Sequence, residues 1–287
     1  MKLGVFTQWI KADSIEELAL RIRQLGLQCV VLDSFPGLPI DLDNPTPAIC
    51  SRIKAAFAQA KVEIAAVGGY SNLAHPDPQI RQAIHTRFQG LIRLSAAIGA
   101  PMLCTEVGTY DAQDEWNWNP ANATEQALND LIASVRPLVA YAQDYGVLLG
   151  IEPYVMTIIN TPQRAVSFVE ALDIHQVRIV ADPAGMLTRG TLDEQSSFLP
   201  AAFHAISPYI GLVHVEDCRP DPAGHFFWLP AGQGLLEYPL FMDLLLQARY
   251  DGPFILEHLS EAALPAAREY VLSQWKLANE RAGQVQL

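Results

Sequence analysis

The stretch Val147-Leu-Leu-Gly-Ile-Glu152 is an unbroken apolar run that ends in a carboxylate. Near-continuous Val, Ile and Leu over this length is typical of a strand covered on both faces, as in a parallel sheet. A carboxylate at the end of such a strand is costly to bury unless it is paired or binds a metal ion. The stretch therefore predicts a buried parallel strand whose last residue has a chemical role.

The same pattern recurs three times further along the chain. Arg178-Ile-Val-Ala-Asp182 and Phe254-Ile-Leu-Glu257 end in carboxylates, and Leu212-Val-His214 ends in an imidazole. One such residue alone is compatible with a carboxylate that caps a loop, or with a core histidine bonded to a backbone carbonyl. Four of them at the ends of apolar strands are better explained by one shared site.

Short apolar runs and longer amphipathic segments alternate from end to end, which predicts strands joined by crossover helices. The strand candidates are residues 3–7, 29–33, 63–67, 102–106, 147–152, 178–182, 211–215 and 254–257. We therefore predict an α/β fold, a (β/α)8 TIM barrel that forms a single domain over residues 1–287. An open doubly wound sheet is the alternative, but no Gly-x-Gly-x-x-Gly motif follows the first strand.

The composition excludes several classes of partner. The chain has 19 basic and 31 acidic residues and a net charge of −12, so it repels phosphate backbones and is not expected to bind nucleic acid. No run reaches the ~18 apolar residues that a membrane span needs. The N-terminal MKLGVFTQWIKADS lacks the pattern of a signal peptide, and the four cysteines form no Cys-x-x-Cys pair. We expect a cytoplasmic protein without a membrane partner.

In a barrel, the four strand ends would meet at the face where the strands finish. Strand alternation places Glu152 on the same side of its strand as Leu148 and Gly150, and the other three runs behave alike. Three carboxylates and one imidazole suit one divalent metal ion, with Mn²⁺, Mg²⁺ or Co²⁺ favoured and Zn²⁺ as a further option.

Motifs along nearly the whole chain add to this pattern. They are Asn72-Leu-Ala-His75-Pro-Asp77, Cys104-Thr-Glu106-Val-Gly108-Thr, Gly150-Ile-Glu152-Pro, Ala181-Asp182-Pro183, His214-Val-Glu-Asp217, Pro230-Ala-Gly232-Gln-Gly234 and Ile255-Leu-Glu257-His258. On these residues the chain resembles the xylose isomerase-like TIM barrels, specifically the sugar phosphate isomerase/epimerase family. The resemblance implies that Glu152, Asp182, His214 and Glu257 are the metal ligands, and that Glu152 and Glu257 are the catalytic pair. It also allows a homo-oligomer, since relatives form dimers or tetramers.

The chemistry that this resemblance implies is proton transfer on a small sugar-like substrate. A metal ion that chelates a carbonyl and an adjacent hydroxyl acidifies the C–H between them and stabilises the resulting enediolate. One carboxylate removes the proton and the other returns it. We expect a metal-dependent isomerase or epimerase of carbohydrate metabolism, acting on a sugar, a sugar phosphate or a hydroxy-ketone.

Three other functions are weighed against this one. A dehydratase (lyase) of the inosose or dehydroshikimate type would use the same metal site and is the main alternative. A non-catalytic sugar-binding barrel would not need two opposed carboxylates. An apurinic endonuclease-like enzyme needs several more histidine ligands at the strand ends, whereas most of the seven histidines of this chain lie elsewhere.

The residues expected to read the substrate depart from the family pattern at two positions. Many relatives place a substrate-contacting His three residues after the metal-binding Asp, where this chain has Gly185, and a Lys two residues after the metal-binding His, where it has Glu216. The identity of the substrate therefore does not carry over from the resemblance.

Six residues are candidates for substrate contact: His75, Glu106, Trp116, Asp217, Arg219 and His225. Each has a structural alternative, such as turn bonds for His75 or a salt bridge to Asp217 or Asp221 for Arg219. The aromatic segment 225–228 is expected in a long loop after the seventh strand. His258 is expected to point outward into the helix layer.

Overall fold

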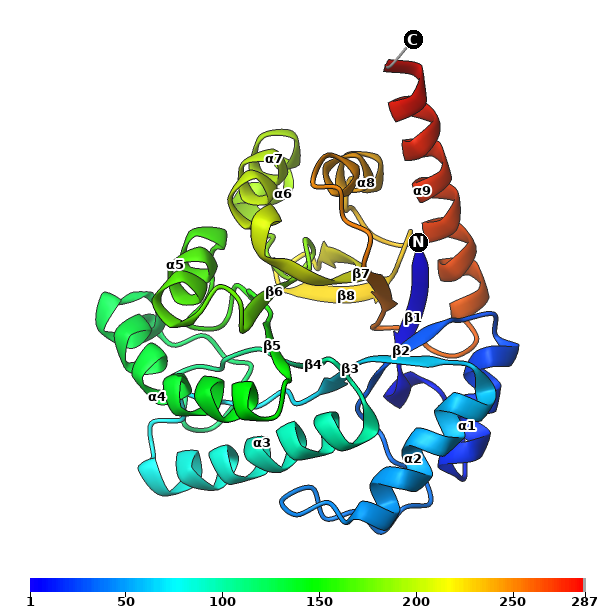
Figure 1. Ribbon diagram of the computed structural model, residues 1–287. Helices are drawn as coiled ribbons and strands as arrows, with labels where there is room; N and C mark the ends of the chain where they lie inside the picture. Colours follow the sequence, from blue (N-terminus) through cyan, green and yellow to red (C-terminus); the bar gives the residue numbers. More distant parts are fainter. Residues whose placement is uncertain (286–287) are drawn as a thin grey trace.

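A computed structural model, which describes residues 1–285, arranges the strands as a closed ring (Figure 1). The strands of the ring are β1 (Lys2–Phe6), β2 (Cys29–Leu32), β3 (Glu63–Gly68), β4 (Met102–Thr105), β5 (Leu148–Ile151), β6 (Val177–Ala181), β7 (Ile210–Pro220) and β9 (Pro253–Leu256). Each is parallel to its neighbours, and the ring closes because β7 pairs with both β6 and β9 while β9 pairs with β1. The predicted (β/α)8 barrel is confirmed.

The helices surround this ring, as Figure 1 shows from α1 round to α9. They are α1 (Ile15–Gln24), α2 (Pro47–Ala60), α3 (Pro78–Ile98), α4 (Glu125–Asp144), α5 (Pro162–Leu172), α6 (Arg189–Leu192), α7 (Gln195–Ile206), α8 (Tyr238–Gln247) and α9 (Leu264–Val285). Short 3₁₀ turns lie at η1 (Thr7–Trp9), η2 (Pro120–Ala123) and η3 (Ser207–Tyr209). Their starts follow from the sequence: the side chains of Asp77 and Thr161 accept N–H groups of the first turns of α3 and α5, each with Pro next in the chain.

One further strand, β8 (Phe226–Pro230), corrects the expectation of an irregular loop after the seventh strand. It pairs antiparallel with the end of β7, so that Cys218 lies opposite Trp228. The turn between them is closed by Gly224, whose φ of +94° favours glycine and whose N–H donates to the carbonyl of Asp221. The hairpin extends β7 beyond the barrel and brings Trp228 over the barrel mouth.

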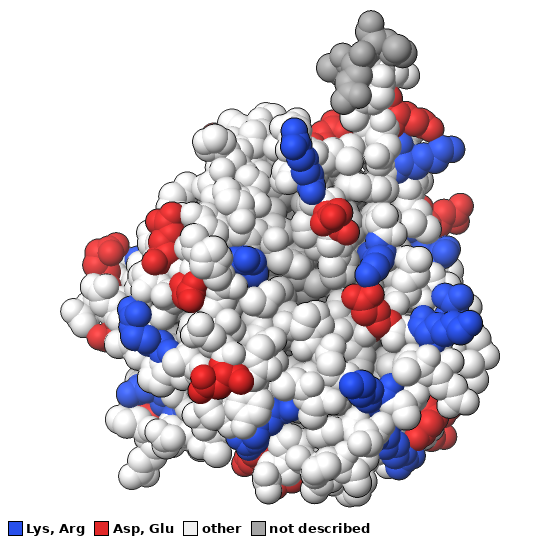
Figure 2. All heavy atoms as spheres, viewed as in Figure 1, with Lys and Arg blue, Asp and Glu red and all other residues white. Residues whose placement is uncertain are grey.

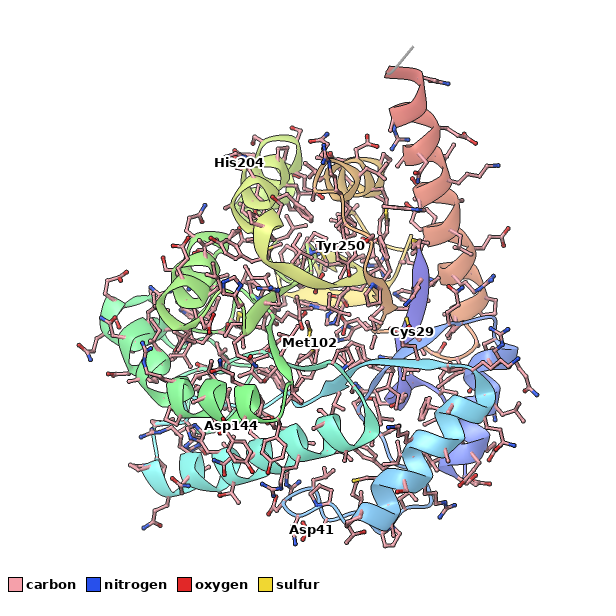
Figure 3. The ribbon with its side chains drawn as sticks, viewed as in Figure 1. Cys29, Asp41, Met102, Asp144, His204 and Tyr250 are labelled. Atoms are coloured by element: carbon pink, nitrogen blue, oxygen red, sulfur yellow. The ribbon has the colours of Figure 1, made fainter. Side chains whose placement is uncertain are left out.

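The lumen of the barrel is filled by side chains and does not form a pore. A cluster that includes Phe6, Cys29, Met102 and Ile255 packs inside the ring, and Figure 3 shows Met102 and Cys29 among the strands. The large core between the strands and the helices surrounds this ring. All four cysteines are buried and free, which agrees with the lack of Cys-x-x-Cys pairs in the sequence.

Charged side chains lie singly on the face seen in Figure 2, with both signs mixed and no continuous basic patch. This distribution fits the acidic composition and offers no footprint for a nucleic acid on that face. Within residues 1–285, no helix has the length and apolar character to cross a membrane.

A glycine in α3 tests how tightly the outer layer is packed. A Cβ at Gly90 would overlap the carbonyl oxygen of Leu42, which belongs to the segment before α2. We expect Gly90→Ala to lower the free energy of unfolding by about 1–3 kcal/mol, because backbone must move to make room. Urea denaturation measures the change. The matched control is Gly283→Ala in α9, where nothing lies within 4 Å of the added Cβ, and which should be neutral or raise stability by up to about 1 kcal/mol. Equal losses in both variants would contradict this account of the packing.

Candidate metal centre and active site

Four side chains from four strands meet at the end of the barrel where the strands finish. Glu152, Asp182 and Glu257 each directly follow a strand, β5, β6 and β9, while His214 lies within β7. One ligand atom from each of the four lies within 4.8 Å of the others. His214 Nδ1 is 3.0 Å from Glu152 Oε1 and 2.8 Å from Glu257 Oε1. The structure thus brings together all four residues that the sequence predicts as ligands.

The four side chains are nearly inaccessible to water, and their charges act strongly on one another. Burial raises the pKa of Asp182 to about 8, and the charges of Glu152 and Glu257 add to this shift. Burial opposes ionisation of Glu257, but the charge and the hydrogen bond of His214 outweigh it and leave the pKa of Glu257 below its ordinary value. Burial also opposes the charge on His214, yet both glutamates together raise its pKa well above the usual range.

Several polar atoms of this cluster have no hydrogen-bond partner among the described residues. They are His214 Nε2, Glu106 Oε2 and Glu216 Oε1, all shielded from solvent. A buried group left unpaired costs about 1–3 kcal/mol, and more when it is charged. Three carboxylates and an imidazole that converge with unpaired atoms match the donor set of a divalent cation, so the residues present fit a metal ion.

A cavity of 520 Å³ opens directly above this cluster. Its lining residues are Phe6, Gln8, Asp33, Gly68, Tyr70, Glu106, Trp116, Glu152, Tyr154, Asp182, Trp228, Glu257 and His258. The rings of Tyr154 and Trp228 meet edge to face at 5.8 Å. A volume of this size, with aromatic walls and a few convergent polar groups, is typical of a small-molecule site.

Two of the six residues that the sequence nominates for substrate contact line this cavity. Glu106 is partly buried just after β4, and the low-polarity surroundings of its carboxyl group together with the charge of Glu152 raise its pKa well above the ordinary range. Trp116, in the loop between β4 and α4, is 40% exposed and forms part of the wall.

The other four nominated residues are not among those that line the cavity. His75 Nδ1 accepts the N–H of Asp77. This is the local turn bond named above as the structural alternative to substrate contact. Arg219 stacks on Phe227, and His225 lies 3.3 Å from Asp221 at the exposed tip of the β7–β8 hairpin. Arg219 and His225 both belong to the β7–β8 hairpin, a segment that the sequence predicted as a loop.

Asp217 has an internal structural role. Its Oδ1 accepts the N–H groups of Cys218 and Leu236 at 2.9 Å each, and its Oδ2 accepts that of Gly232 at 3.1 Å. The carboxylate therefore fixes the segment between β8 and α8, and both of its oxygens are occupied.

Sequence reasoning placed His258 outside the site, and the structure corrects this. The backbone of His258 has a φ of +48°, which is uncommon for a residue with a Cβ and turns the side chain back toward the cavity. Its Nδ1 is bonded to the buried carboxylate of Glu216, and its ring lies between those of Trp9 and Trp228. No pattern in the sequence indicates this backbone conformation.

Tyr70 and Tyr154 are also part of the site and were missed. Tyr70 lies two residues after β3, and its hydroxyl donates to Glu152 Oε2 at 2.8 Å. Tyr154 lies two residues after Glu152. Their position just beyond strand ends is the signal that could have identified both, because barrel sites are built from those loops.

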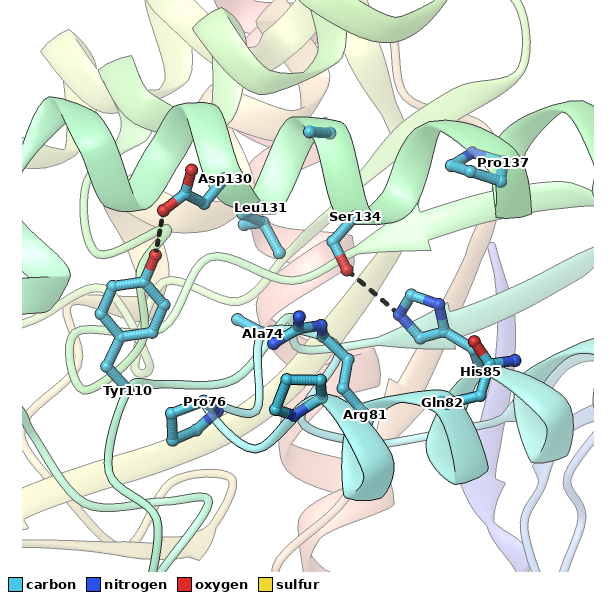
Figure 4. A pocket seen from close by; sticks show the side chains of 12 residues that line it. Ala74, Pro76, Arg81, Gln82, His85, Tyr110, Asp130, Leu131, Ser134 and Pro137 are labelled. Carbon is cyan, nitrogen blue, oxygen red and sulfur yellow. Dashed lines mark hydrogen bonds between the residues drawn. The ribbon is translucent and has the colours of Figure 1, made fainter.

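A second, larger cavity of 850 Å³ lies on the outside of the barrel, between α3 and α4 (Figure 4). Its polar groups are already paired: the Tyr110 hydroxyl donates to Asp130 at 2.8 Å, and the Ser134 hydroxyl lies 3.1 Å from His85 Nε2. No cluster of unpaired ionisable atoms among the described residues faces it. The mouth of the barrel is therefore the better candidate for chemistry.

A closed parallel barrel with three carboxylates and an imidazole at its strand ends defines a class of proteins whose barrel mouth could hold a cation. The family model of the xylose isomerase-like TIM barrel matches residues 19–274, and the chain belongs to this family. It is 26% identical over 215 residues to L-ribulose-5-phosphate 3-epimerase UlaE of Shigella flexneri serotype 5b, a match that covers 73% of this chain and 70% of that enzyme.

Solved structures share the fold over almost the whole chain. An L-ribulose 3-epimerase superposes with a TM-score of 0.78 at 15% identity, over 100% of this chain and 99% of that one. A xylose isomerase-like TIM barrel protein from Mycobacterium smegmatis, in complex with magnesium, has a TM-score of 0.69 at 21% identity and covers 92% of this chain and 88% of its own.

Proposed function

We propose that this protein is a sugar epimerase or isomerase that depends on a divalent metal ion. The observation that carries the proposal is the placement of Glu152 and Glu257, whose carboxylates contact the same nitrogen of His214 at the floor of one cavity. Two buried carboxylates on either side of a substrate are what removal and return of a carbon-bound proton require. The names of the relatives, which are sugar epimerases, support the same reaction class.

Glu152, Asp182, His214 and Glu257 would hold the metal ion, and their mainly oxygen donors suit Mg²⁺, Mn²⁺ or Co²⁺ best. When bound, the ion would supply a Lewis acid that polarises a substrate carbonyl.

The protein's own residues prepare the two carboxylates for proton transfer. Glu257, with its lowered pKa, is ionised at neutral pH and ready to accept a proton. Glu152 is held by Tyr70 through Oε2, which leaves Oε1 toward His214 and the centre of the site. The walls of Trp116, Tyr154 and Trp228 limit access of water to the reacting carbon.

Metal content and proton exchange test the proposal together. Purified protein, analysed by inductively coupled plasma mass spectrometry, should contain about one divalent ion per chain or take one up from Mn²⁺. In D₂O, the loaded protein should then incorporate deuterium at a single carbon of a ketose, read by NMR. A protein that takes up no metal, or that exchanges no carbon-bound proton in any ketose, contradicts the proposal.

A further inference from the structure

We propose that the site accepts an uncharged sugar and discriminates against its phosphate ester. This inference rests on the proposed function and adds the class of substrate to it. The first observation is the charge of the cavity. Among the described residues that line it, none is lysine or arginine, whereas Asp33, Glu106, Glu152, Asp182 and Glu257 are carboxylic acids. One divalent cation would offset only part of this negative charge.

Three backbone amides before α8 that could replace a cationic side chain are already occupied. In TIM barrels, phosphate groups are frequently bound by N–H groups of the loops near the last strands and by a helix N-terminus. Here the N–H groups of Gly232 and Leu236, in the segment leading to α8, donate to Asp217. The next N–H, that of Glu237, donates to Gln195 Oε1 at 2.9 Å. An internal carboxylate therefore fills the place that a phosphate would need.

The arginine of the β7–β8 hairpin faces away from the cavity. Arg219 pairs with Phe227 across the hairpin, and Trp228 pairs with Cys218. Paired residues share a face of the hairpin, and successive residues alternate between faces. Since Trp228 lines the cavity, Arg219 and Phe227 belong to the opposite face, where the guanidinium lies 5.4 Å from the ring centre of Phe227. Arg219 is thus unable to serve as a phosphate ligand from this hairpin position.

His258 is the remaining side chain of the lining that could carry positive charge, and it is already paired. Its Nδ1 is bonded to Glu216, whose carboxylate is inaccessible to solvent. His258 therefore has one ring nitrogen, Nε2, left for a ligand. It can still donate or accept one hydrogen bond, which suits a sugar hydroxyl.

The walls of the cavity suit a neutral sugar. Trp116, Tyr154 and Trp228 supply apolar faces on which the C–H faces of a sugar can pack, while the carboxylates accept hydrogen bonds from its hydroxyls. A dianionic phosphate would lose its hydration without gaining a cationic partner from the protein.

Paired ligands test the inference by direct binding. Protein loaded with one equivalent of Mn²⁺ is titrated with L-ribulose and L-ribulose 5-phosphate, and with D-tagatose and D-tagatose 6-phosphate, with calorimetry and tryptophan fluorescence as readouts. We expect at least one free sugar to bind, and to bind about tenfold or more tightly than its own phosphate ester. A phosphate ester that binds as tightly as its free sugar, or binding of neither, overturns the inference.

A charge added at the rim provides the complementary variant. Gln8 lines the cavity and is exposed. The substitution Gln8→Lys should therefore reduce the ratio of the affinity for the free sugar to that for its phosphate ester by about fivefold or more. Gln8→Met, which has similar length and no charge, is the matched control and should leave the ratio unchanged. An unchanged ratio in Gln8→Lys would show that a missing cation does not cause the discrimination, and would overturn its explanation.

Deuterium incorporation in the same samples separates the two proposals. If a free sugar binds preferentially but exchanges no proton, the result contradicts the epimerase reaction and supports the preference for an uncharged ligand. Exchange that proceeds equally well with both members of a pair supports the reaction and contradicts the discrimination.

Discussion

Glu257→Gln and Glu152→Gln should each lower the turnover number for epimerisation by about 10²–10⁴, the usual contribution of a positioned general acid or base. Glutamine keeps one oxygen that can bind a cation and has nearly the same shape, so the lost property is the ability to take up a proton. If the two carboxylates act on opposite faces of the substrate, the variants should differ in what they retain. Each variant keeps one of the two glutamates. It should therefore still exchange deuterium into the epimer from which that glutamate removes the proton.

The measurement is NMR of both epimers incubated separately in D₂O with each variant. Glu16→Gln, on the exposed face of α1 where Glu16 pairs with Arg52, is the control and should stay within about twofold of the parent. Retention of more than about a tenth of the parent turnover by either variant, with metal content intact, would argue that its carboxylate is not an acid or base in the reaction.

The functional role of the strand ends was predictable because few reasons justify an ionisable side chain at a buried position. An ionisable residue directly after a buried apolar strand is costly, so Glu152, Asp182 and Glu257 indicated a shared purpose before any contact was known. The topology of a barrel then places such residues around one axis. The positions of β5, β6 and β9 differ from the predicted ranges by a residue or so at each end, which leaves this argument intact.

The substrate shell was less predictable, since it depends on backbone geometry that composition does not encode. His258 reaches the cavity through a left-handed backbone conformation, and a regular strand would have turned it outward. Arg219 was nominated because it lies just after His214 in the chain, and His225 because its segment was predicted as a loop. The stretch Pro220-Asp-Pro-Ala-Gly224 nevertheless carries a turn signal before the aromatic run. Asp217 gave no sign in the sequence that it accepts the N–H groups of Gly232 and Leu236, which lie beyond its own strand.

The second large effect concerns Asp182, where stability and metal binding should respond in opposite directions. In the folded, metal-free protein the pKa of Asp182 is raised to about 8, against roughly 3.9 in an unfolded chain. Between these values the folded state keeps a proton that the unfolded state has released. Stability therefore falls as pH rises through this window, by up to about 1.4 kcal/mol per pH unit for one proton, and the loss is complete above pH 8.

Asp182→Asn removes this titration while Oδ1 can still accept the N–H of Ala184. Without metal, the variant should match the parent near pH 4, where Asp182 is protonated in the folded state and about half protonated in the unfolded chain, and be more stable than the parent at pH 8. With Mn²⁺ this advantage of the variant at pH 8 should become smaller, because ligand at 100 times its Kd adds about 2.7 kcal/mol only to a protein that binds it. Urea denaturation at both pH values, with and without Mn²⁺, measures the four cases.

The control for this experiment is Asp144→Asn at the exposed end of α4, which should change stability by less than about 0.5 kcal/mol throughout. Two results would refute the account: a metal-free variant less stable than the parent at pH 8, or equal stabilisation of both proteins by Mn²⁺. These opposite effects of the carboxylate on stability and on metal binding have a simple physical origin. Carboxylates gathered without their cation repel one another and resist burial, so the geometry that binds a metal ion reduces the stability of the metal-free fold.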